Sequence, residues 1–127
     1  MKELKTFAPQ LKQYAIKELK HFIDLLVKEE NLTEKSLQIF PKNQPAYKHT
    51  IAMLQNLKDM FNNLLNFIEK VDLNSKDTEM KLKNYFSSIL KETNIAIRDK
   101  SVIFPVKVIL EGVFQRLKRL GNLLQAI

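Results

Sequence analysis

The chain has 127 residues, 45% of them hydrophobic and 28% charged, and a formal net charge of +7 at pH 7. This length and hydrophobic fraction suit a single folded domain and argue against disorder. The absence of cysteine excludes disulfides, thiolate zinc sites and cysteine nucleophiles, and the two glycines and four prolines favour long helices over a turn-rich β fold.

Apolar residues recur at steps of three and four positions from Leu4 to Leu26. This spacing predicts an amphipathic helix, because residues three or four apart share one helix face. Proline is tolerated in the first helical turn, so Pro9 places the helix start near Thr6, a suitable cap. We therefore expect a first helix over about 6–30.

The connection over 31–44 is rich in apolar residues and is not a solvated linker. Thr33 can cap a short helix that ends before Pro41. We expect a short helix or ordered loop over about 33–40 that covers one end of the core. A contact surface for a partner, with Phe40 exposed, is the alternative.

Pro45 is well placed as a first helical residue, and apolar periodicity predicts a long second helix over about 45–71. A second apolar row lies beside its main stripe, at Met53, Met60 and Phe67. The row indicates either a central helix with two neighbours or an adaptable docking groove, since methionine suits adaptable interfaces.

A third helix is predicted over about 75–98 and a fourth over about 101–125. Ser101 can cap the fourth helix, with Pro105 in its first turn. Gly121 either ends this helix or marks a close-packing point within it. The apolar stripe of the fourth helix is the cleanest in the chain, at Val102, Val106, Ile109, Leu110, Val113, Leu117, Leu120 and Leu124.

Four helices joined by short turns predict an all-α, antiparallel, up-down-up-down four-helix bundle that forms one domain over 1–127. No apolar run reaches the roughly 18 residues of a transmembrane helix. No secretory signal is visible either, so the expectation is a soluble cytoplasmic protein. A signal removed before residue 1, or secretion without a signal peptide, would leave the same sequence.

Positive charge gathers on the fourth helix, where four cations accompany one acidic residue, Glu111. They are candidate contacts to nucleic acid or to an anionic membrane surface. Complementing the helix dipole and keeping the surface soluble is the simpler interpretation. The four candidate residues are Lys107, Arg116, Lys118 and Arg119.

No catalytic, metal or cofactor motif is complete. Glu18 and His21 have the spacing of a di-iron ligand pair, but the second pair that such a site needs is missing. A phosphotransfer role for His49 would need a lysine and a glycine where Ala52 and Met53 stand. We therefore expect no enzyme, no metal and no cofactor.

Three hypotheses on function remain. The first is a small protein-interaction module of the adaptor, chaperone, effector or inhibitor type, with Phe40, Met53, Met60 and Phe67 as candidate contacts. The second is an electrostatic binder of nucleic acid or anionic lipid. The third is a bacteriocin-immunity-like protein, an analogy of fold and charge only. The abundance of lysine and asparagine suggests an AT-rich, bacterial genome, and wide apolar faces on the first two helices make a homodimer an open expectation.

Overall fold

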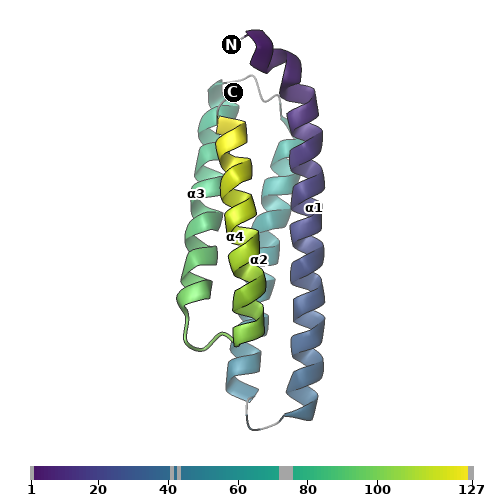
Figure 1. Cartoon of the computed structure of the whole chain (residues 1–127), viewed down its shortest axis with the longest axis vertical. Coiled ribbons are helices and arrows are strands. Elements are labelled where there is room, and N and C mark those ends of the chain that lie inside the picture. Colours follow the sequence, from purple (N-terminus) through teal and green to yellow (C-terminus); the bar gives the residue numbers. More distant parts are fainter. Residues whose placement is uncertain (1, 41, 43, 72–75, 126–127) are drawn as a thin grey trace.

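The computed structural model describes residues 2–40, 42, 44–71 and 76–125. Consecutive helices run in opposite directions and pack along a common axis (Figure 1). The described ranges contain no strand, and the prediction of an all-α antiparallel four-helix bundle is confirmed. The helices are α1 (Lys2–Ile39), α2 (Gln44–Lys70), α3 (Lys76–Arg98) and α4 (Phe104–Gln125).

The core is built from the inward face of every helix. Phe22, Phe61 and Phe86 are the largest fully buried side chains, from α1, α2 and α3. The rings of Phe22 and Phe61 meet edge to face with centroids 5.9 Å apart, a favoured aromatic geometry. The predicted stripe of the fourth helix is buried except at Ile109, which is half-buried against the core.

The first helix differs from its prediction at both ends. It begins at Lys2 with Pro9 inside it, and it continues without a break to Ile39. The segment 33–40 is therefore helical through Ile39, but it is the end of α1 rather than a separate element. Thr33 does not cap a new helix, because its buried hydroxyl donates to the Glu29 carbonyl oxygen at 2.7 Å within the same helix.

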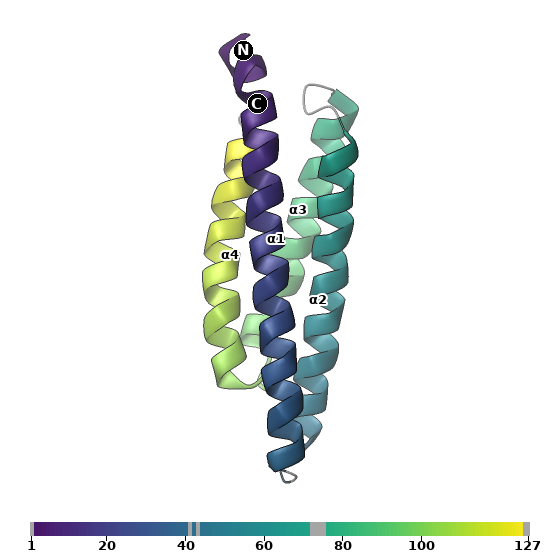
Figure 2. The ribbon, with the colours of Figure 1, turned by 90° about the vertical axis from the view of Figure 1, so that its right-hand side faces the viewer.

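The four helices differ in length, and this gives the bundle a step. At about 1.5 Å per residue, the 38 residues of α1 span roughly 57 Å, against roughly 33 Å for the 22 residues of α4. The lower ends of α1 and α2 project beyond the loop between α3 and α4 (Figures 1 and 2). The α1–α2 hairpin thus leaves a concave corner beside the start of α4.

The fourth helix starts at Phe104, three residues after the expected cap Ser101. Asp99 organises the preceding turn instead: its side-chain Oδ1 accepts the Ser101 N–H at 2.8 Å, and its carbonyl accepts the Val102 N–H at 3.2 Å. The buried Thr50 hydroxyl accepts the Ile103 N–H at 3.2 Å. These bonds satisfy the backbone N–H groups of Ser101, Val102 and Ile103, the three residues that precede α4.

Gly121 is a close-packing point within α4, which continues to Gln125. A Cβ atom added at Gly121 would lie 3.1 Å from the Phe86 ring, so the glycine lets α4 approach α3 closely. The sequence left open whether Gly121 ends the fourth helix or marks a close-packing point within it, and the second alternative is confirmed. None of the helices in the described part of the chain combines the length and the apolar character needed to cross a membrane.

Candidate interaction surface

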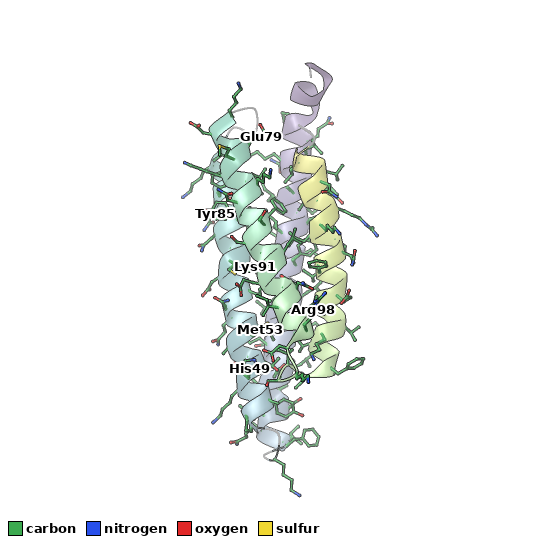
Figure 3. The ribbon with its side chains drawn as sticks, turned by 90° about the vertical axis from the view of Figure 1, so that its left-hand side faces the viewer. His49, Met53, Glu79, Tyr85, Lys91 and Arg98 are labelled. Atoms are coloured by element: carbon green, nitrogen blue, oxygen red, sulfur yellow. The ribbon has the colours of Figure 1, made fainter. Side chains whose placement is uncertain are left out.

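The second apolar row of α2 contributes to the core more than to the surface. Met53, Met60 and Phe67 are all half-buried and pack against the buried cluster. The Phe67 ring lies against the Tyr85 ring of α3, with centroids 5.0 Å apart (Met53 and Tyr85 are labelled in Figure 3). Phe67 therefore packs at the α2–α3 seam, where it also lines a shallow hollow of about 440 Å³ with Tyr85.

Phe40, the remaining expected partner contact, lies at the projecting end of the α1–α2 hairpin. Its N–H donates to the Ser36 carbonyl at 2.8 Å, which extends the last turn of α1. Phe40 is 52% exposed and the adjacent Ile39 is 67% exposed. Phe40 thus remains an exposed candidate contact at this end of the hairpin, whereas the α2 row is half-buried.

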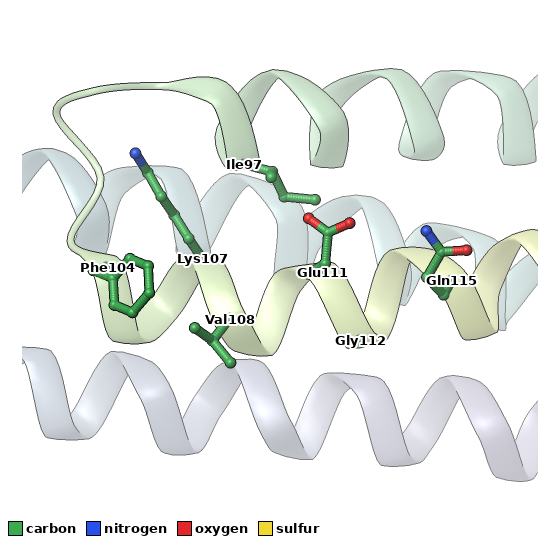
Figure 4. A pocket seen from close by; sticks show the side chains of 7 residues that line it. All are labelled: Ile97, Phe104, Lys107, Val108, Glu111, Gly112 and Gln115. Carbon is green, nitrogen blue, oxygen red and sulfur yellow. The ribbon is translucent and has the colours of Figure 1, made fainter.

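The four candidate anion-binding residues differ in their contacts. Arg116 turns toward α1, where its Nη2 donates to both Glu18 carboxylate oxygens at 2.9 and 2.8 Å, and its guanidinium lies 5.3 Å from the Phe22 ring centroid. Lys107 points to the α3 side of α4 (Figure 4). Lys118 and Arg119 are exposed and form no salt bridge within the described ranges.

His49 and Asp99 form a short contact between α2 and the α3–α4 loop. The His49 Nε2–H donates to Asp99 Oδ2 at 2.6 Å, near the lower end of α3 (Figure 3). Hydrogen bonds from His49 and from the Ser101 N–H, in that order, hold the pKa of Asp99 below its ordinary value. The pair thus ties the loop that precedes α4 to the second helix.

The largest unexplained apolar exposure is on the solvent side of α4. Phe104 is 75% exposed and Val108, one turn later, is 54% exposed. Together with Ile97 of α3 they line a shallow groove of about 450 Å³ (Figure 4). We call its α4 residues the α4 outer face: Phe104, Lys107, Val108, Glu111, Gly112 and Gln115.

The groove continues around the step of the bundle. Phe104 and Lys107 also line a hollow of about 520 Å³ at the concave corner, together with Tyr47 of α2 and Ser36 of α1. One connected concave surface therefore runs from the middle of α4 to the projecting hairpin. Helices α1, α2 and α4 and the α3–α4 loop line the corner hollow, and α3 contributes Ile97 to the groove.

The α4 outer face is absent from the sequence-based candidates, although a signal for it exists. Phe104, Val108 and Gly112 recur every four residues, on the side of the helix opposite the core stripe at about 100° per residue. Two apolar side chains in such a row are a weak signal, since isolated apolar residues are common on surfaces. Burial of the stripe on the other side was needed to show that this row is exposed.

The described residues contain no cluster of three or more His, Asp or Glu side chains that could hold a metal ion. Glu18, half of the suspected di-iron pair, forms a salt bridge with Arg116 instead.

Comparisons with protein-family models, curated proteins and solved structures gave no match to this chain.

Proposed function

We propose that this protein is a non-enzymatic protein-interaction module that binds its partner on the α4 outer face. The observation that carries the proposal is the exposure of Phe104 and Val108 beside Ile97 in a common groove. Burying apolar surface contributes roughly 25 cal/mol per Å², and these side chains leave that contribution unused in the isolated chain. Adaptor, chaperone, effector and inhibitor roles all need such a surface.

The concave form of the site supports a protein partner. Binding energy concentrates where large apolar side chains enter well-packed hollows surrounded by polar groups. Here Phe104 and Val108 are bordered by Lys107, Glu111 and Gln115. An apolar centre with a polar border is the usual composition of an interface that forms and separates.

The cations of α4 are assigned an auxiliary role in this proposal. Because Arg116 is held by Glu18, three cations of the expected set remain to attract a partner: Lys107, Lys118 and Arg119. Such charges raise association rates and make them depend on salt. An electrostatic binder of nucleic acid or anionic lipid is the competing function, and binding by charge alone would weaken steeply with salt.

The test compares two pairs of equally exposed apolar residues. Phe104→Ser with Val108→Ser removes groove side chains that are 75% and 54% exposed, whereas Met80→Ser with Ile95→Ser removes side chains of α3 that are 71% and 51% exposed. Affinity capture from native cells, quantified by mass spectrometry, should lose a discrete protein with the first pair and keep it with the second. Equal loss with both pairs, or with neither, would refute the proposed surface.

A further inference from the structure

We infer that the occupant of the α4 outer face is an amphipathic α-helix of another protein, with acidic residues flanking its apolar stripe. The inference rests on the proposed function and specifies the partner. It is carried by the spacing of the groove residues, by the surroundings of Gly112 and by the charges around the groove.

The α4 outer face has the spacing of a helix-packing surface. In helix–helix packing, a side chain of one helix enters a hole formed by four residues of the other at positions i, i+3, i+4 and i+7. The groove residues of α4 form two such holes in succession. The first consists of Phe104, Lys107, Val108 and Glu111, and the second consists of Val108, Glu111, Gly112 and Gln115.

These two holes extend over about three helical turns, or roughly 16 Å of α4. A partner helix with apolar residues at i, i+3 or i+4, and i+7 would fill them. Ile97 borders the groove on the α3 side and gives such a helix a second apolar contact. The site therefore suits a helix better than an extended peptide, whose side chains alternate every two residues.

Gly112 lacks an explanation within the chain. An interior helical glycine costs about 1 kcal/mol relative to alanine. Gly121 has a reason, because a Cβ atom there would make a tight contact of 3.1 Å with the Phe86 ring, but a Cβ atom at Gly112 would meet nothing within 4 Å. Gly112 thus keeps the floor of the second hole open, where a partner side chain can come close to the backbone of α4.

The surrounding charges select an acidic partner. Lys107 borders the groove, and Lys118 and Arg119 follow about one turn after Gln115. Glu111 is the one acidic side chain of α4. A second copy of the chain would bring another net charge of +7, so electrostatic complementarity favours a different, acidic protein.

The probe for the test is a labelled synthetic helix of about 18 residues, or roughly five turns. It carries leucines at i, i+3, i+4 and i+7 spacing and glutamates beside them. The matched control peptide has lysine in place of each glutamate. Fluorescence anisotropy at moderate salt should give tighter binding of the acidic peptide by about tenfold or more.

Two variants probe the second hole and its specificity. Gly112→Leu fills the hole and should weaken acidic-peptide binding by about tenfold or more, as removal of an interface anchor does. The variant Ser87→Leu adds the same side chain to an exposed position of α3 and should leave binding unchanged. Amide chemical-shift changes in the wild-type protein should centre on residues 104–115 and Ile97.

Three results would overturn the inference. They are equal binding of the two peptides, unchanged acidic-peptide binding by Gly112→Leu, and shift changes centred on another helix. Preferential binding to phosphatidylglycerol vesicles would assign the face to a membrane, and dimerisation blocked by Gly112→Leu would assign it to a second copy. In each of these cases the capture experiment decides the proposed function separately. If the Phe104→Ser and Val108→Ser pair still abolishes capture of the partner, the proposed function stands with a different occupant. If that pair leaves capture unchanged, the proposed function and the inference both fail.

Discussion

Gly112 and Gly121 differ in the space that surrounds a side chain introduced at each position. At Gly112 a new side chain extends into open space on the solvent side of α4, whereas at Gly121 it meets the Phe86 ring. The same substitution made at each glycine therefore measures two different effects: the gain in helix propensity at Gly112 and the cost of overpacking the core at Gly121. Neither glycine has a positive φ angle, so backbone strain does not enter the comparison.

Leucine at each position gives a matched pair. Gly112→Leu should raise the free energy of unfolding by about 0.5–1 kcal/mol, because leucine is the better helix former. By contrast, Gly121→Leu should lower it by about 1–3 kcal/mol through overpacking against Phe86. Urea unfolding followed by circular dichroism measures both, and a loss of stability in Gly112→Leu would contradict the open surroundings of Gly112.

Arg116 is a structural residue in this fold. Its Nη2 pairs with Glu18, and its guanidinium packs on the Phe22 ring at 5.3 Å from the centroid, which joins α4 to α1. Arg116→Ala should reduce stability by about 1 kcal/mol, since an exposed ion pair and a cation–π contact each contribute about half of that or slightly more. The control Lys118→Ala should change the free energy of unfolding by less than about 0.5 kcal/mol. Equal effects of the two substitutions would argue against the structural role.

Asp99 makes the stability of the protein depend on acid. Hydrogen bonds from His49 and Ser101 lower the pKa of Asp99 in the folded chain below the ordinary value of 3.8. Its stabilising contribution is therefore complete above that value and is lost as the pH falls through the folded-state pKa. Asp99→Asn should flatten the pH dependence of the unfolding midpoint below about pH 5.

The control for this experiment is Asp59→Asn, which removes an exposed carboxylate but leaves the hydrogen bonds of Asp99 intact. Thermal melts at a series of pH values measure the effect. An acid dependence that is the same in Asp99→Asn and in the wild type would show that the contacts with His49 and Ser101 do not stabilise the fold.

At the scale of the helix, α4 carries two faces with different duties. Its inner stripe is almost wholly buried, whereas Phe104 and Val108 on the outer face are exposed. Leu110→Ala should lower the free energy of unfolding by about 2–5 kcal/mol, as deletions in a core do. Val108→Ser should change it by less than about 0.5 kcal/mol, as surface substitutions do. Chemical denaturation tests the contrast, and a large cost for Val108→Ser would mean that the outer face packs against the chain itself.

The inner stripes of the helices were predictable from the sequence because burial follows the period of the helix. Leu110, Leu117 and Leu124 illustrate this, since each lies on the predicted stripe of the fourth helix and is fully buried or nearly so. The end of the first helix was not predictable in the same way. Thr33 resembles a cap in the sequence, but its hydroxyl bonds within the helix, and no glycine or proline stops α1 before Pro41.

The candidate surface could not be predicted from the sequence, because its prediction requires knowing how the helices pack against one another. Met60 and Phe67 appear surplus to the stripe of α2, but the packing of α2 beside α3 and α1 uses them. Arg116 appears as one cation among four, until the register of α1 and α4 places Glu18 beside it. Exposed apolar residues can be recognised only once the residues of the core are known.

At the scale of the whole molecule, the bundle presents a concave surface that is bordered by positively charged side chains. The unequal helices produce a corner beside Phe104, and the groove of α4 opens into it. The net charge of +7 attracts acidic proteins over a distance that shortens as salt is added. Shape would then determine which of these proteins remains bound.

Site-specific photo-crosslinking tests the central claim that α4 binds a protein through its outer face. A benzophenone amino acid replaces Val108, which is 54% exposed, in one variant and Met80 of α3, which is 71% exposed, in another. The account predicts a discrete protein adduct in native cells from position 108, none from position 80, and loss of the adduct when Phe104→Ser is added. Adducts of equal yield at both positions, or an adduct at position 108 that survives Phe104→Ser unchanged, would contradict it.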